Sequence, residues 1–171
     1  MTKHEKLTVR LKKYLRSIFI IFILYILFFE LIWNGLLSYF QSEATRGLNT
    51  ISNAEKGHYQ SYASWSENFG DILIGFDKSS KYVYFISPTE YEGRSLEELG
   101  LSLPVDFLSL DVPMPGLIEE GFVAVAIGNI DLDDELDIWW IDQNNIPRNS
   151  KSDVWSVWKA VLRISKYIQD Y

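Results

Sequence analysis

The sequence predicts an α+β fold, in which a long N-terminal helix packs on a small antiparallel β-sheet and a shorter helix follows at the C-terminus. Three observations support this prediction. Residues 17–40 are almost entirely apolar, residues 44–62 repeat apolar side chains at helical spacing, and short strand-like segments separated by turn residues come after them. The long helix should therefore be transmembrane first and amphipathic afterwards.

The apolar run is long enough to cross a bilayer. Residues 17–40 contain one charged side chain, Glu30, and they exceed the roughly 20 residues that a spanning helix needs. They show no polar stripe, which a helix of a soluble core would have. A cleaved signal peptide is the alternative, but its apolar core is usually only about 7–15 residues long. We therefore expect a single-pass membrane anchor.

Charge predicts the orientation of that anchor. Residues 1–16 hold six Lys or Arg and one Glu, which gives this segment a net charge of +5. Because the whole chain carries −7, the remaining residues carry −12. Basic flanks stay in the cytoplasm. We expect a basic cytoplasmic tail at residues 1–16, the transmembrane helix at 17–40 and an extracytoplasmic domain at 41–171. A domain with this much negative charge repels phosphate groups, which argues against nucleic acid as a partner.

The external domain begins with the amphipathic part of the helix. Side chains of an apolar stripe recur there at spacings of three and four, namely Ala44, Leu48, Ile51, Ala54, His58 or Tyr59, and Tyr62. The polar residues between them are assigned to the solvent face, namely Glu43, Arg46, Asn49, Asn53, Glu55 and Lys56.

A sheet of three or four strands is expected next. Strands are predicted at residues 81–86, 121–128 and 138–142, with a short apolar segment at 72–76 and one helical turn at 96–99. The last two strands flank a short loop and should pair as an antiparallel hairpin. The C-terminal helix is predicted from one apolar face, formed by Trp155, Trp158, Val161, Leu162 and Ile168.

The hairpin loop is acidic and is the candidate metal site. Asn129, Asp131, Asp133 and Asp137 place oxygen ligands at nearly alternate positions. Hard cations such as Ca²⁺ take six to eight oxygen ligands. The alternative is a solvated turn whose Asn and Asp side chains cap their own backbone. Calcium is the one cofactor that the sequence suggests.

Two further features have a functional and a structural interpretation. Glu30 lies within the apolar run, and intramembrane carboxylates often mark contacts, so it is a candidate subunit or membrane contact. It is alternatively protonated or close to the outer interface. Tryptophans could form a ligand platform or simply pack the domain, and they are Trp139, Trp140, Trp155 and Trp158.

No catalytic constellation is present, and the chain has no cysteine, so disulfides and thiolate sites are excluded. We therefore expect that the protein is not an enzyme.

Two segments carry a resemblance to a known family. The helix segment Gln41-Ser42-Glu43-Ala44-Thr45-Arg46-Gly47-Leu48 and the hairpin from Phe122-Val123-Ala124 through Gly128-Asn129-Ile130-Asp131 to Asp137-Ile138-Trp139 resemble bacterial type IV pilins, especially those of deltaproteobacterial type. The resemblance covers roughly residues 40–87 and 121–150. Pilins carry a leader glycine before the apolar segment, and none precedes it here, so we predict no prepilin peptidase cleavage within the first 17 residues.

The resemblance implies a structural or accessory subunit of a type IV pilus or related secretion machine. Such a protein would sit in the bacterial inner membrane or in a surface filament, and its partners would be other pilin-like subunits or assembly-machine proteins. The alternative is a stand-alone, membrane-anchored binding or sensing module with a pilin-type external domain.

Overall fold

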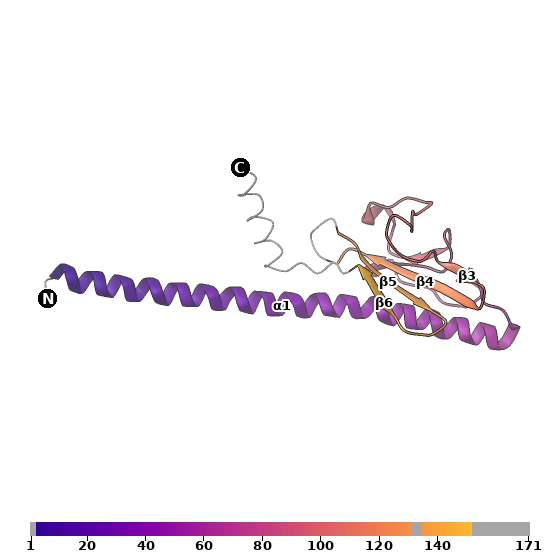
Figure 1. Cartoon of the computed structure of the whole chain (residues 1–171), viewed down its shortest axis with the longest axis horizontal. Helices are drawn as coiled ribbons and strands as arrows, with labels where there is room; N and C mark the ends of the chain where they lie inside the picture. The colour runs from indigo at the N-terminus through magenta and orange to yellow at the C-terminus, as the bar shows by residue number, and fades with distance from the viewer. Residues whose placement is uncertain (1–2, 131–134, 152–171) are drawn as a thin grey trace. The chain divides into compact units, whose positions relative to one another are not determined.

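A computed structural model of the chain describes residues 3–130 and 135–151, and within them it confirms the predicted α+β arrangement (Figure 1). The elements are α1 (Lys3–Tyr62), β1 (Tyr82–Phe85), β2 (Tyr91–Gly93), the 3₁₀ turn η1 (Glu97–Leu99), β3 (Gly116–Ile118), β4 (Gly121–Gly128), β5 (Asp137–Asp142) and β6 (Arg148–Lys151). The predicted C-terminal helix lies outside the described residues.

Helix α1 is continuous over 60 residues, although three glycines interrupt its sequence. From Tyr14 onward it is long and apolar enough to cross a membrane, and none of its most apolar stretch is buried. The chain divides into two compact units, and the second, which holds the sheet, begins at Leu37. The second half of α1 therefore belongs to the folded domain.

The sheet is larger than predicted. Among the described residues, six strands form one antiparallel sheet in the order β2-β1-β4-β5-β6, and β3 pairs with the same edge of β4 as β1 does. The predicted β4–β5 hairpin is confirmed. The short strands β2, β3 and β6 were not predicted, and the apolar segment at residues 72–76 forms turns and irregular structure. Strands β2 and β6 occupy the two edges of the strand order.

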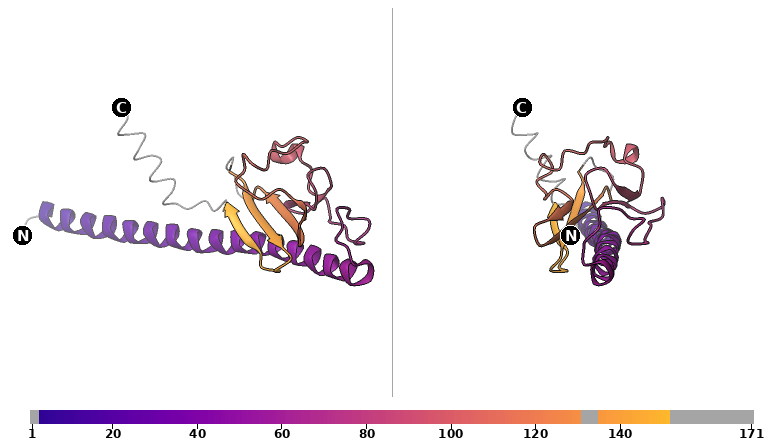
Figure 2. Two further views of the ribbon diagram at one scale, coloured as in Figure 1. Left: turned by 45° about the vertical axis from the view of Figure 1, so that its right-hand side comes forward. Right: turned by 90° about the vertical axis from the view of Figure 1, so that its right-hand side faces the viewer.

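One face of the sheet packs against α1. Four apolar helix residues are at most 1% exposed, namely Leu37, Ala44, Leu48 and Ile51. Tyr84 on β1 pairs with Ala126 on β4, and the Tyr84 ring lies directly against the helix at Gly47. Cross-strand partners share a face, so small side chains on β4 let the helix approach closely. Figure 2 shows α1 on this side of the sheet.

The buried stripe of α1 corrects one expectation. Glu55, which we had assigned to the solvent face, is fully buried, and so is Ser52, while Ala54 is only partly buried. With 3.6 residues per turn, the stripe that runs through Leu48 and Ile51 reaches position 55 rather than 54. The assignment from residue type failed because the buried carboxylate accepts a hydrogen bond from a residue just beyond the end of the helix, as described below.

The other face of the sheet carries a second core. Residues 94–112 cross this face, as Figure 2 shows around η1, and they bury apolar side chains against it. This cluster comprises Val83, Phe85, Leu96, Leu99, Val105, Phe107, Val112, Val123, Val125, Ile127 and Ile138. Because both faces are covered, all eight residues of β4 are buried.

Candidate functional site: a buried carboxylate between helix and sheet

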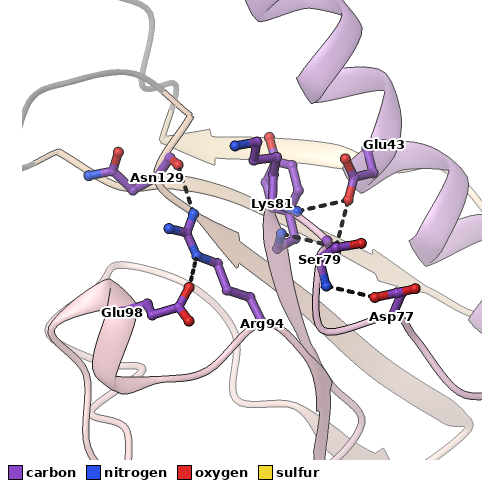
Figure 3. A network of polar contacts seen from close by, with 9 residues as sticks. Glu43, Asp77, Ser79, Lys81, Arg94, Glu98 and Asn129 are labelled. Carbon is purple, nitrogen blue, oxygen red and sulfur yellow. Dashed lines mark hydrogen bonds and ion pairs between the residues drawn. The ribbon is translucent and has the colours of Figure 1, made fainter.

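Two of the four predicted metal residues lie among the residues that the structure describes. Asp131 and Asp133 lie outside the described residues, whereas Asn129 and Asp137 mark the two ends of the loop. The backbone carbonyl of Asn129 accepts a hydrogen bond from Arg94 Nη1 at 3.4 Å, and Arg94 Nε pairs with Glu98 at 3.0 Å (Figure 3). A positive charge thus stands at the first position of the loop.

Among the described residues, Asp137 is a buried side chain with four hydrogen-bond donors around it. It is fully buried at the start of β5. Its Oδ2 accepts hydrogen bonds from Tyr82 OH and from Trp139 Nε1, both at 2.6 Å. Its Oδ1 accepts from Gln41 Nε2 at 3.2 Å and from Asn149 Nδ2 at 3.1 Å. The carboxylate therefore joins α1, β1, β5 and β6, and we call this set the Asp137 junction.

These four donors use much of the accepting capacity of Asp137, since an ionised carboxylate offers about four lone-pair sites. Burial, and then the nearby Asp137 charge, raise the pKa of Tyr82 far above its ordinary value, so its hydroxyl stays a donor at any ordinary pH. Trp139 is one of the candidate platform residues. Its indole N–H, the only donor of the side chain, is bound inside the junction.

For the calcium prediction, this geometry means that Asp137 would have to exchange one or more of these donors for the metal ion. Within the described part of the chain, no group of three or more His, Asp or Glu side chains could hold a metal. The calcium prediction therefore stays a prediction.

We expect Ca²⁺ binding at this loop to raise the free energy of unfolding by about 2.7 kcal/mol at a hundredfold excess over Kd. A thermal melt of the detergent-solubilised chain with calcium and with chelator measures the effect. Asp131→Asn should remove most of the calcium response, whereas Asp111→Asn, in a different loop, should keep it. Superimposable melts of the unmodified protein would discard the site and leave a self-capped turn.

A second anchor ties α1 to the turn before β1. Glu43 Oε1 accepts hydrogen bonds from Ser80 Oγ at 2.6 Å and from the Lys81 backbone N–H at 2.9 Å (Figure 3). Tyr84 OH donates to the backbone carbonyl of Glu43 at 3.1 Å. Burial, and then Glu43, raise the pKa of Tyr84. Sequence reasoning missed this anchor, although Gly47, one turn further on, was a visible sign of close packing.

A pocket of about 480 Å³ lies beside this anchor, between α1 and residues 76–80. Its lining includes the side chains of Glu43, Arg46, Phe76, Asp77 and Tyr84. Arg46 and Asp77 are exposed and the pocket is open to solvent. Because exposed charges are screened by water, these two groups hold little selectivity for a ligand.

Glu30, the remaining predicted site residue, lies in the apolar part of α1. A comparison with protein-family models and with curated proteins finds no family and no relative that match the chain. The candidate site thus rests on the chain's own geometry.

Proposed function

We propose that the protein is a membrane-anchored, pilin-like structural or accessory subunit that acts by helix-mediated packing in a type IV pilus or related secretion machine. One observation carries the proposal: the helix that presents the exposed apolar segment is the same helix that forms the spine of the folded domain. A subunit that packs through its helix needs an apolar helical segment that continues in sequence into its folded domain.

The orientation belongs to the same proposal. The basic residues before the apolar segment favour a cytoplasmic N-terminus and an extracytoplasmic domain, in the bacterial inner membrane or in a filament at the surface. Glu30 is proposed as the contact with a neighbouring helix, because a carboxylate in the apolar segment is costly unless it has a partner.

Cysteine cross-linking can test this proposal without background, because the sequence contains no native cysteine. Single cysteines placed in turn at positions 24–34 report helix contacts by oxidative cross-linking in native membranes. We expect cross-linked products, with this chain or with another subunit, at every third or fourth position on the face of Glu30. Glu30→Leu should weaken them, and the matched change Leu31→Ala should not.

The control cysteine is Asn53→Cys, on the exposed surface of α1 in the domain. It should react with a membrane-impermeant maleimide added from outside, which checks the orientation. If the chain stays monomeric with a cysteine at every tested position of the span, the packing function is contradicted. That result would favour the second candidate, a stand-alone binding or sensing module. The pocket beside Glu43 is the observation in favour of that candidate.

A further inference from the structure

Glu55 is a buried carboxylate that the packing function does not use. It lies on the buried stripe of α1 and is 0% exposed. Its Oε2 accepts one hydrogen bond, from the Ser66 backbone N–H at 3.0 Å, and its Oε1 is buried with no hydrogen-bond partner among the described residues. Ser52 Oγ, one turn earlier on the same helix face, is likewise buried and unpartnered there. A buried charge with a single donor is costly.

The segment that supplies this donor is held to α1 at three points. Besides the Glu55–Ser66 bond, His58 Nδ1 lies 2.8 Å from the Ser64 carbonyl oxygen, and the Trp65 ring stacks on Tyr59 with centroids 4.5 Å apart. The Trp65 ring also lies 5.2 Å from the ring of Phe122 on β4. Residues 64–71 thus close over the end of the helix and the start of β4.

Two other charged groups act on Glu55. His58 is one turn further along α1, and Asp71 lies in the closing segment, where its Oδ2 accepts a hydrogen bond from Ser66 Oγ at 3.1 Å. Burial raises the pKa of Glu55, with Asp71 adding to the rise, while the Ser66 N–H and His58 oppose it. The closed arrangement consequently favours the neutral acid.

We propose that Glu55 is a proton-sensitive latch that holds residues 64–71 on α1 when its carboxyl is protonated and loosens them when it ionises. The neutral carboxyl is far cheaper to bury than the carboxylate, whose Oε1 has no hydrogen-bond partner among the described residues. Opening hydrates the carboxylate and uncovers the aromatic surface of Tyr59, Trp65 and Phe122. The latch thus couples external pH to an aromatic surface at the end of α1.

The sign of the effect follows from linkage. The pKa of Glu55 is raised in the closed state, so the stabilisation of closure is fully present below the ordinary glutamate pKa and is lost as pH rises through the raised, closed-state pKa. Across that window the ratio of closed to open protein falls about tenfold for each unit by which the closed-state pKa exceeds the open-state pKa.

Fluorine NMR of the full chain in non-ionic detergent, labelled with 5-fluorotryptophan, tests the latch. The Trp65 resonance is assigned as the one that Trp65→Phe removes, and Trp33, in the apolar segment, serves as the internal reference. We expect the Trp65 resonance to titrate with a midpoint above the ordinary glutamate pKa, in the unmodified protein and in His58→Gln. In Glu55→Gln, which mimics the neutral acid, it should stay at its low-pH position.

Asp71→Asn provides a second readout that does not depend on the folding of Glu55→Gln. The amide keeps an acceptor for Ser66 Oγ but removes the negative charge that raises the Glu55 pKa, so the midpoint of the Trp65 transition should move to lower pH. A flat Trp65 resonance in the unmodified protein overturns the latch. A transition that survives Glu55→Gln but disappears in His58→Gln assigns the titration to His58, and an unmoved midpoint in Asp71→Asn also overturns the proposal.

Discussion

Gly47→Ala should destabilise the domain by about 1–3 kcal/mol, although alanine is the better helix former. A Cβ at this position would overlap the hydroxyl end of the Tyr84 ring, at Cε1, Cζ and the hydroxyl oxygen. That ring has little freedom to move, because its hydroxyl donates to Glu43 and its face stacks on Phe76 with centroids 4.0 Å apart. Helix and β1 must separate to admit one methyl group.

Gly57→Ala is the matched control, since nothing lies within 4 Å of the Cβ that it adds. On the same helix it should be neutral or stabilise the domain by up to about 1 kcal/mol. Urea unfolding of the detergent-solubilised chain, followed by tryptophan fluorescence, measures both variants. Adding Tyr84→Ala to Gly47→Ala should cost less than the sum of the two single changes, because the clash is then gone. Equal effects of the two glycine substitutions would contradict the close contact.

Elements with long apolar patterns could be predicted from the sequence, whereas short or irregularly patterned elements could not. Helix α1 was predicted from its long apolar run and from the apolar residues at helical spacing that follow it. The β4–β5 hairpin was predicted from two apolar strand segments that flank a short loop. Strand β6 was missed since its four residues are all exposed and show no alternation. The layer over the second face was missed because its buried residues, such as Leu96 and Phe107, are spaced irregularly between prolines and glycines.

The candidate site was predicted in part, and for a different chemistry. Asp137 stood out as one carboxylate of an acidic loop, but its partners Gln41 and Tyr82 lie 96 and 55 residues away in the chain. Glu55 was assigned to solvent for the same reason, because the Ser66 N–H that it binds becomes its neighbour only in the folded domain. A single sequence shows which groups need partners and does not show which groups supply them.

Asp137→Ala should have the largest effect of any single change in the domain, a loss of about 3–5 kcal/mol. It leaves four donors, on Gln41, Tyr82, Trp139 and Asn149, without their acceptor. A folded domain typically has only about 5–15 kcal/mol of stability in total, so the variant should be unfolded or nearly so at physiological temperature. Tyr82→Phe removes one donor alone and should cost about 1.5–3 kcal/mol.

Asp142→Ala is the control at the other end of β5. Its carboxylate mainly binds the backbone and side-chain nitrogens of Asn144 in the following turn, and its removal should cost only about 1 kcal/mol. Running each urea melt in calcium and in chelator separates the two roles considered for Asp137. As a junction residue, its loss costs the same in both solutions, because protein donors are what it binds. A cost that appears in calcium and vanishes in chelator would instead make Asp137 a metal ligand, because the metal-free protein would then gain nothing from the carboxylate.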